Sequence, residues 1–395
     1  MLLCYKMEVY EADGQNRSLF KYIKLRYILV SLVALSAIQY PHQVKAAEAT
    51  FTVTNTNDSG LGSLRQAITD ANANGNPTDM DVVEFDIPGT EIHTINLQSD
   101  LPPITEKLTI DGYTQNGAQA NSATSPNPIN SIIKIEIDGS TATINESALK
   151  LVADESVVKG LAVLNSSGLS NVFSKANVVL IGDNTSVQGS FIGLRADGTT
   201  VGEIDKNSVS IDCQGLNVIV GGNSPSDRNI LFNKSSIGQS AAVIIEAGHA
   251  SLFGNYIGMA KDGVTDLTTY TLDMNSYSGP YSIGINIINS GTGTIGGAST
   301  GQRNLISGNS VGIIISSPDN IVQNNIVGPD YTGRVQSTIT NGIGITSTVG
   351  TNSIIGGTGT GEGNLIAGTS ASGVEIMGIS IPNLGLELNP EKLLY

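Results

Sequence analysis

Tryptophan is absent from this chain of 395 residues, cysteine occurs only twice, and charged residues make up 14% of the sequence. Cys4 lies in an N-terminal segment that we expect to be removed, which leaves Cys213 without a partner for an intrachain disulfide. The three histidines, His42, His93 and His249, are scattered, and no spacing of His or Cys suggests zinc. Stability must therefore come from packing and hydrogen bonds rather than from covalent or metal cross-links.

Basic residues are also scarce. The sequence has 20 Lys and Arg against 35 Asp and Glu, a formal net charge of −15. Nucleic acid is therefore not an expected partner, because its phosphates require clustered Lys and Arg. A solvated acidic surface is the simplest interpretation of this charge. An acidic polymer would be repelled at long range, although one local basic strip could still bind it.

Long apolar runs are missing as well. The run at Tyr27–Ile38 has twelve residues, whereas a membrane-spanning helix needs about 20. Lys21, Lys24 and Arg26 precede this run, and Ala47–Ala49 offers a small-x-small cleavage site. We therefore interpret residues 1–47 as a signal peptide, with a membrane anchor as the alternative, and expect a secreted or cell-surface protein without a transmembrane span in the mature chain. The polar start is unusual for a signal, so the true start is expected at residue 7 or later.

Glycine is abundant, with 46 residues, and it belongs to a repeat. Gly-Gly pairs ending at Gly222, Gly297 and Gly357 are each followed, seven residues later, by Asn229, Asn304 and Asn364. Short apolar runs alternate with clusters of Gly, Asn and Ser, and no 3.6-residue periodicity runs long enough for a long helix. This pattern predicts an all-β fold made of stacked repeats.

One helix is nevertheless predicted near the start of the mature chain. Ser63 can cap its first turn, and Gln66, three residues later, can reach back as in a capping box. An apolar stripe follows at i, i+3, i+4 and i+7, and the helix should end within residues 72–77; the stripe is Leu64, Ala67, Ile68 and Ala71. Such an amphipathic helix is expected to cover the open end of the first coil.

Three segments carry a resemblance to a known family: FTVTNTNDSGLGSLRQAITDAN at 51–72, DVVEFDIPG at 81–89 and LTIDGYTQ at 108–115. They resemble bacterial exported proteins with a C-S-L-R-E-A motif, which implies the right-handed parallel β-helix (solenoid) of the pectin lyase-like superfamily. This chain has Gly62 where the motif has Cys and Gln66 where it has Glu. The resemblance implies a cap strand, helix and first coil at 50–104 and β-helix repeats at 105–389. Residues 390–395 would be a truncated tail, too short to cover an open coil.

A recurring tripeptide defines the expected register. An apolar residue, any residue, and then Gly or Asn recur at intervals of 21 to 42 residues, which suits a coil of three strands. We predict nine coils in one register, with the apolar member inward. The nine tripeptides begin at Ile110, Ile137, Val158, Val187, Val220, Phe253, Ile295, Val322 and Ile355.

Repeated polar residues are expected to be structural. Asn229, Asn304 and Asn364 would share one corner, and Asn255 and Asn324 another, with side-chain amides bonded from coil to coil. Sugar binding is the alternative for these amides. Three loops with similar glycine spacing contain Asp197, Asp262 and Asp330, for which a plain loop role is favoured over Ca²⁺ binding. Arg228 and Arg303 share a coil position that Gly363 takes in the third copy, which argues against an essential repeated role.

One candidate catalytic site follows from the expected register. Asp111, Asp138 and Lys159 occupy the same position in three consecutive predicted coils, about 5 Å apart. Superfamily members that cleave pectin-like polymers often use Ca²⁺ held by carboxylates and a base, so the resemblance implies Ca²⁺ at Asp111 and Asp138 with Lys159 beside them. The alternative is that each Asp favours the turn before its glycine. No other cofactor is indicated.

Two functions remain open from the sequence. The first is a secreted or cell-surface scaffold, adhesin-like or carbohydrate-binding, whose partners would be polysaccharide or cell-envelope components. The second is a polysaccharide lyase or glycoside hydrolase acting on an acidic polysaccharide at Asp111, Asp138 and Lys159. Nothing in the sequence sets an oligomeric state.

Overall fold

The computed structural model describes residues 48–75, 79–142, 147–166, 176–203, 208–233, 239–267, 281–335, 341–348 and 352–376. All of them belong to one compact unit that starts at Glu48. The predicted signal peptide at 1–47 and the predicted tail at 390–395 lie outside the described residues. No helix in the described part of the chain is both long and apolar enough to cross a membrane.

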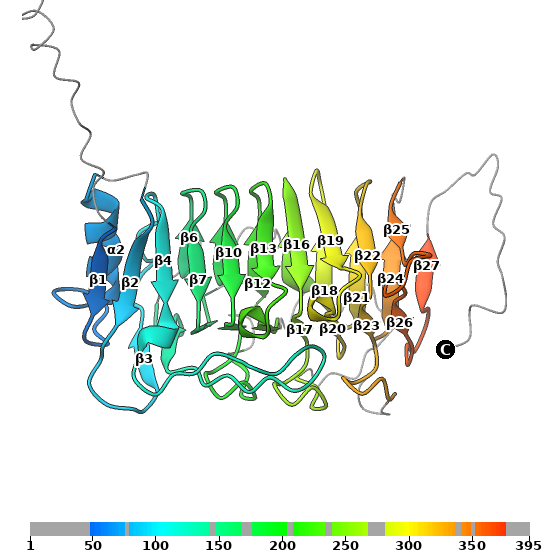
Figure 1. The fold of residues 1–395 in the computed structure, drawn as a ribbon, viewed down its shortest axis with the longest axis horizontal. Helices are drawn as coiled ribbons and strands as arrows, with labels where there is room; N and C mark the ends of the chain where they lie inside the picture. Colours follow the sequence, from blue (N-terminus) through cyan, green and yellow to red (C-terminus); the bar gives the residue numbers. More distant parts are fainter. Residues whose placement is uncertain are drawn as a thin grey trace, which may run out of the picture. The chain divides into compact units, whose positions relative to one another are not determined.

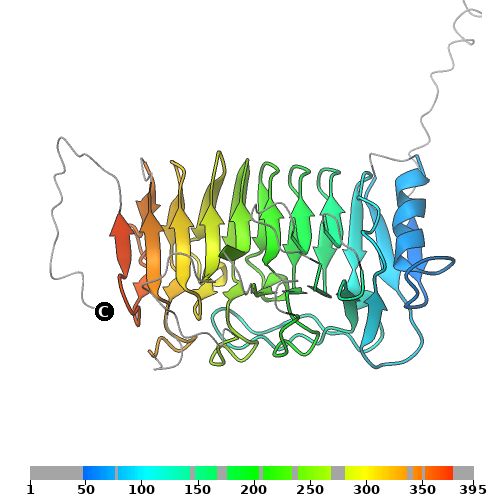
Figure 2. The same ribbon diagram turned by 180° about the vertical axis from the view of Figure 1, so that it is seen from behind.

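Three parallel sheets, with ten, nine and eight strands, make up the unit. We number them sheet 1, sheet 2 and sheet 3. From β4 (Leu108–Asp111) onward, a strand of sheet 1 is followed by one of sheet 2 and one of sheet 3, and the next coil pairs in parallel with the last. Figures 1 and 2 show the coils stacked side by side. The fold is a right-handed parallel β-helix, with the hand that parallel connections almost always adopt.

The strands of each sheet follow one another in chain order. Sheet 1 contains β1 (Thr50–Val53), β2 (Asp81–Phe85), β4 (Leu108–Asp111), β7 (Val157–Lys159), β10 (Ser186–Gln188), β13 (Val218–Gly221), β16 (His249–Phe253), β19 (Thr292–Gly296), β22 (Ile321–Gln323) and β25 (Ile354–Ile355). Sheet 2 contains β3 (His93–Asn96), β5 (Ile135–Asp138), β8 (Leu161–Leu164), β11 (Phe191–Ile192), β14 (Ile230–Leu231), β17 (Tyr256–Ile257), β20 (Leu305–Ile306), β23 (Ile326–Val327) and β26 (Leu365–Ile366). Sheet 3 contains β6 (Leu149–Leu151), β9 (Val178–Leu180), β12 (Val209–Cys213), β15 (Gln239–Ile245), β18 (Tyr281–Ile287), β21 (Val311–Ile315), β24 (Ile343–Ser347) and β27 (Val374–Ile376).

The inward row of sheet 1 confirms most of the predicted register and corrects two members. Ile137 is not in this row, because it lies on β5 of sheet 2, where it pairs with Ile95 and Val163. In β16 the inward residue is Leu252 rather than Phe253, since Leu252 pairs with both Val220 and Ile295. The row consists of Ile110, Val158, Val187, Val220, Leu252, Ile295, Val322 and Ile355. At two different corners of the coil, a turn comes directly after an inward apolar residue. The tripeptide alone therefore does not show which sheet the residue belongs to.

The predicted N-terminal helix is present as α2 (Leu64–Ala73) and lies at the β1 end of the stack (Figure 1). Ser63 caps it, its side chain accepting a hydrogen bond from the Gln66 N–H. The Gln66 side chain does not reach back as predicted, because it donates to Asp70 one turn later. All four predicted stripe residues are buried and join the interior core, so α2 shields the first coil from water.

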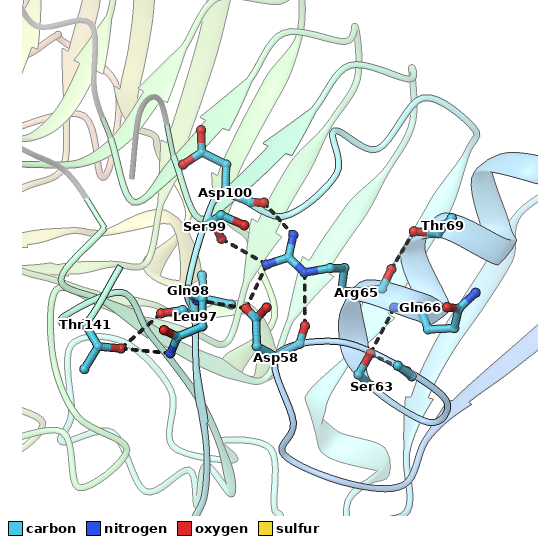
Figure 3. A network of polar contacts seen from close by, with 11 residues as sticks. Asp58, Ser63, Arg65, Gln66, Thr69, Leu97, Gln98, Ser99, Asp100 and Thr141 are labelled. Carbon is cyan, nitrogen blue, oxygen red and sulfur yellow. Dashed lines mark hydrogen bonds and ion pairs between the residues drawn. The ribbon is translucent and has the colours of Figure 1, made fainter. Parts of the chain in front are cut away.

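A clamp made by Arg65 fastens α2 to the coil beneath it (Figure 3). Its guanidinium donates to the carbonyl oxygens of Asp58, Ser99 and Asp100, and to the Asp58 carboxylate at 2.8 Å. The same carboxylate oxygen accepts from the Gln98 N–H. Burial opposes the charge of Asp58, but the bonds from Arg65 and Gln98 outweigh it, and the pKa of Asp58 is lowered. The SLR sequence thus combines a cap, a core residue and a clamp.

A ladder of asparagine amides runs along the corner between sheets 1 and 2, as predicted. The first four Nδ2 groups each donate to the Oδ1 of the next amide at 2.9–3.1 Å, and all five also donate to a backbone carbonyl. The ladder consists of Asn229, Asn255, Asn304, Asn325 and Asn364. The predicted second corner is therefore wrong. Asn255 belongs to the same ladder as the other amides. Asn324 is not a member; it directly precedes the ladder residue Asn325 and accepts hydrogen bonds from Arg303.

Candidate functional site

Asp111 and Lys159 lie side by side on the outer face of sheet 1, as predicted. They are paired residues of β4 and β7, and Lys159 Nζ is 2.9 Å from Asp111 Oδ2. The other carboxylate oxygen accepts from the Tyr113 N–H and thereby caps the short 3₁₀ turn η1 (Gly112–Thr114). The Tyr113 hydroxyl in turn donates to the carbonyl of Gly189. Asp111 therefore has a structural role as a cap, which the turn interpretation predicted.

Asp138 lies on a different sheet, so the predicted constellation is separated. It ends β5 of sheet 2, pairs with Asn96 and Leu164, and is not in the row of Asp111. Burial disfavours its charge, but hydrogen bonds from Asn165 and Ser140 and the charge of Arg195 lower its pKa overall. The Ca²⁺ pair expected from the register is thus not assembled. Among the described residues, no group of three or more His, Cys, Asp or Glu is arranged to hold a metal ion.

Arg195 joins Asp138 to a second buried carboxylate, Glu136. Its two terminal nitrogens lie 3.1 Å from Glu136 Oε2 and 3.0 Å from Asp138 Oδ2. Glu136 also accepts from the Ala196 N–H at 2.8 Å. Both acids lie on β5, whereas Arg195 lies in the loop after β11. The ion pairs therefore hold this loop against sheet 2. Sequence reasoning missed the cluster because its members lie about 60 residues apart.

The Asp side chains of the three repeated loops accept hydrogen bonds from residues of their own loops, as the plain loop interpretation predicted. Asp197 accepts from the backbone N–H of Thr199 and Thr200 and from the Thr200 hydroxyl. Asp262 makes the same set of bonds to Val264 and Thr265. Hydrogen bonds within each loop therefore hold these two carboxylates in place.

The outer face of sheet 2 carries a continuous apolar row that a long hairpin partly covers. The hairpin, residues 119–132, is closed by paired hydrogen bonds between Gln119 and Ile132. Its Ile129 is buried in the same cluster as the outward residues of β11, β14, β17 and β20. Those residues are almost fully buried; they are Phe191, Ile230, Tyr256 and Leu305. Figure 1 shows this long segment running across several later coils.

Hydrogen bonds hold the hairpin tip to the corner of the coils. Arg228 is buried and donates through Nη1 to the carbonyls of Ala123 and Asn127, at 2.9 and 2.8 Å. Its guanidinium stacks on the Tyr256 ring, 4.9 Å from the centroid, and the Tyr256 hydroxyl donates to the carbonyl of Pro126. Arg228 forms no ion pair within the described ranges. The repeated arginine position thus has a structural use in its first copy.

A cavity of about 340 Å³ opens where the hairpin ends. Its lining comes from the tip, the outward row of sheet 2 and the loop after β23: Pro126, Arg303, Asn325, Ile326, Tyr331, Thr332, Gly333, Gly363 and Leu365. Arg303 donates through Nε and Nη2 to the neutral Asn324 side chain and has no acidic partner in the described part of the chain. Gly363 occupies the arginine position of the third copy, and its missing side chain leaves space beside Arg303.

The described lining of this cavity contains no Asp, Glu, His, Cys or Lys. Tyr331 is its one side chain of a type that commonly takes part in general acid–base catalysis. An aromatic ring, two apolar residues and an arginine line one space, and the Asn325 amide beside them is bonded within the ladder. A second cavity of about 280 Å³ lies on the other side of the tip, lined by Thr124, Ser125, Asn223, Ser224, Pro225, Arg228, Ser299, Thr300 and Gly301.

Comparison with known proteins adds little beyond this geometry. No protein-family model matches the chain, and no curated protein matches it. Among solved structures, pectate lyase Pel9A is similar over 85% of this chain and 78% of its own, with 12% identity and a TM-score of 0.38. The Dettilon tailspike protein is similar over 80% of this chain and 64% of its own, with 10% identity and a TM-score of 0.32. The description of the fold rests on the strand pairing above.

A buried carboxyl on sheet 3 should make stability depend on pH. Asp212 is almost fully buried, and one oxygen accepts from Gln214 while the other has no partner within the described residues. Burial raises its pKa to about 7, the Gln214 bond opposes this, and the charge of Glu246 adds to it. The folded protein therefore keeps this proton up to about pH 7, whereas the unfolded chain releases it near pH 4.

We expect wild-type stability to fall between about pH 4 and pH 7, because the folded state binds more protons there. Asp212→Asn should raise the free energy of unfolding by about 1–3 kcal/mol at pH 8 and have little effect at pH 4. Urea denaturation at both pH values measures this. An equal effect of the substitution at both would contradict a shifted pKa. Asp86→Asn, at an exposed position without a side-chain hydrogen bond among the described residues, is the control for simple charge removal.

Proposed function

We propose that this protein is a β-helix scaffold that binds saccharide in the cavity at the hairpin tip, without catalysing a reaction there. The observation that supports this is the combination of Tyr331 and Arg303 with apolar residues around one cavity of about 340 Å³. That volume is at the lower end of the range for small-molecule pockets, about 300–1,000 Å³, and suits about one or two sugar rings.

Each part of the lining matches a part of a sugar. Sugar rings have an apolar face that packs on aromatic side chains, as the Tyr331 ring provides. Their hydroxyls accept from guanidinium groups, as Arg303 provides. Ile326 and Leu365 form an apolar floor. Glycoside hydrolysis, by contrast, normally requires two carboxyl groups about 5–9.5 Å apart, and the described lining contains none.

We also propose that the protein acts outside the cell, on polysaccharide or cell-envelope material. Support comes from the signal-like sequence of residues 1–47. Hydrogen bonds of the ladder and of the clamped cap join the described coils to one another. These features suit a durable surface that presents one binding cavity.

The test is binding to a panel of saccharides, followed by calorimetry on those that bind. We expect Tyr331→Ala and Arg303→Ala each to weaken binding at least tenfold, because each removes a lining group, while Tyr331→Phe keeps the ring and most of the affinity. Arg334→Ala, an exposed arginine near the same loop, is the matched control and should bind like wild type. Failure of the wild-type protein to bind any saccharide would reject the proposal.

A second candidate is a lyase or hydrolase acting on an acidic polysaccharide. Arg228 and Arg303, which lack carboxylate partners in the described coils, favour an acidic ligand despite the net negative charge. Assays for unsaturated products or new reducing ends on pectate and alginate would show such activity. Activity that survives both Lys159→Ala and Asp138→Asn would place catalysis away from the residues predicted from the sequence.

A further inference from the structure

The outward row of sheet 2 is one continuous apolar surface beneath the hairpin and the loops after β11 and β17. The row runs through seven paired strands: Ala162, Phe191, Ile230, Tyr256, Leu305, Ile326 and Leu365. Its residues are buried as far as Ile326 and only partly buried at Leu365. An extended polymer could lie along such a row only where nothing else occupies it.

The hairpin covers the row together with two loops. Its Ile129 packs into the same apolar cluster as Phe191, Ile230 and Tyr256. The backbone N–H of Ile129 donates to the carbonyl of Lys261 at 2.8 Å, which ties the hairpin to the loop after β17. Residues of the loops after β11 and β17 join the same cluster: Leu194, Ala196, Met259, Ala260 and Leu267. The row is therefore covered as part of the core.

The tip of the hairpin forms a wall at one side of the cavity. Pro126 lines the cavity of about 340 Å³, and Ser125 next to it donates from its hydroxyl to the carbonyl of Arg303 at 2.7 Å. The cavity on the far side of the tip shares no lining residue with this one. Because Arg228 and Tyr256 also hold the tip, a bound chain cannot continue past Pro126 along the row.

We infer that the cavity binds the terminal unit of a saccharide chain and does not bind internal segments. This inference rests on the proposed function. The terminal ring would lie against the hairpin tip, between Tyr331 and Arg303, and the rest of the chain would leave over Leu365 and Gly363. Recognition of an end makes the number of binding sites depend on the number of chains rather than on their mass.

Partial hydrolysis of polysaccharides tests this directly. Pectate, alginate, xylan and dextran are each offered to the wild-type protein intact and after partial acid hydrolysis, at equal mass. We expect the protein bound per gram of a recognised polysaccharide to rise in proportion to the number of chain ends, so that tenfold shorter chains bind about tenfold more. Bound protein that stays constant or falls on hydrolysis would overturn the inference and leave the proposed function intact. Absence of binding to any panel member would instead reject the proposed function.

A hairpin variant tests the cause. Residues 122–129 are replaced by two glycines, which keeps Asn121 and Asn130, joined in the wild type by a backbone N–H to side-chain bond at 2.9 Å. Removal of the tip should take away the wall between the two cavities, so that a chain can continue beyond Pro126 and binding becomes proportional to mass. If a folded variant still binds in proportion to the number of chain ends, the hairpin is not the wall of the cavity. If the variant does not fold, the hydrolysis series on the wild type decides alone.

Discussion

Replacing Asn304 by alanine is expected to lower the free energy of unfolding by about 3–5 kcal/mol, because it leaves several buried groups without partners. Asn304 is fully buried in the middle of the ladder. Its Oδ1 accepts from the backbone and side chain of Asn255, and its Nδ2 donates to the Leu252 carbonyl and to Asn325. Urea denaturation followed by circular dichroism measures the loss.

The control for this substitution is Asn116→Ala, at an exposed position without a side-chain hydrogen bond among the described residues. It should change stability by less than about 0.5 kcal/mol. Asn364→Ala, at the last amide of the ladder, should cost less than Asn304→Ala, since its side chain is only partly buried. Equal losses at Asn304 and Asn116 would show that the ladder contributes nothing specific.

Replacing Arg65 by alanine is expected to cost about 2–4 kcal/mol, because it removes four hydrogen bonds and leaves the Asp58 carboxylate without its ion pair. Both side chains are about one-fifth exposed, so solvent replaces the lost partners only in part. The loss should appear in urea denaturation, together with earlier hydrogen exchange in β1 and β2, which α2 covers.

Arg65→Lys keeps the charge but not the forked donor geometry, and should recover only part of the lost stability. Arg334→Ala, an exposed arginine of the same chain, is the control for general charge removal. A fully stable Arg65→Ala protein would mean that the apolar stripe of α2 holds the cap without the clamp.

The fold can be predicted from the sequence because the residue patterns that determine it are local and recur in each coil. The inward row needs an apolar residue once per coil, and the turn after it often needs a left-handed residue. At Gly296, with φ of 74°, a Cβ would lie 2.0 Å from the Gln323 carbonyl oxygen. The cap was predictable for the same reason, since Ser63 and the stripe of α2 act within a single helix.

The candidate site was not accessible in the same way. Asp138 was placed beside Asp111 because both follow an isoleucine and precede a glycine, yet two different corners of the coil use that pattern. Nothing in the local sequence distinguishes them. The cavity depends on the path of the hairpin, whose Ser125 bonds to a coil 178 residues away. Such a contact is set by tertiary packing and leaves no periodic signal.

The asparagine ladder also shows how far repetition can be read. The shared role of Asn229, Asn304 and Asn364 followed from their fixed distance after a glycine pair. Asn255 and Asn325 belong to the same ladder but follow shorter turns without the 3₁₀ segments η2 (Pro225–Asp227) and η3 (Thr300–Gln302). A change in turn length moves the sequence spacing without moving the amide in space.

Every amide in the ladder points the same way, so its dipoles add along the stack. Each member takes one bond from the coil before it and gives one to the coil after it, whatever the loops between them. A whole coil could be gained or lost between two such amides during evolution, because the amides on either side could form the same hydrogen bond with each other. The number of coils can therefore vary, whereas the first coil still needs the cap that α2 and Arg65 provide.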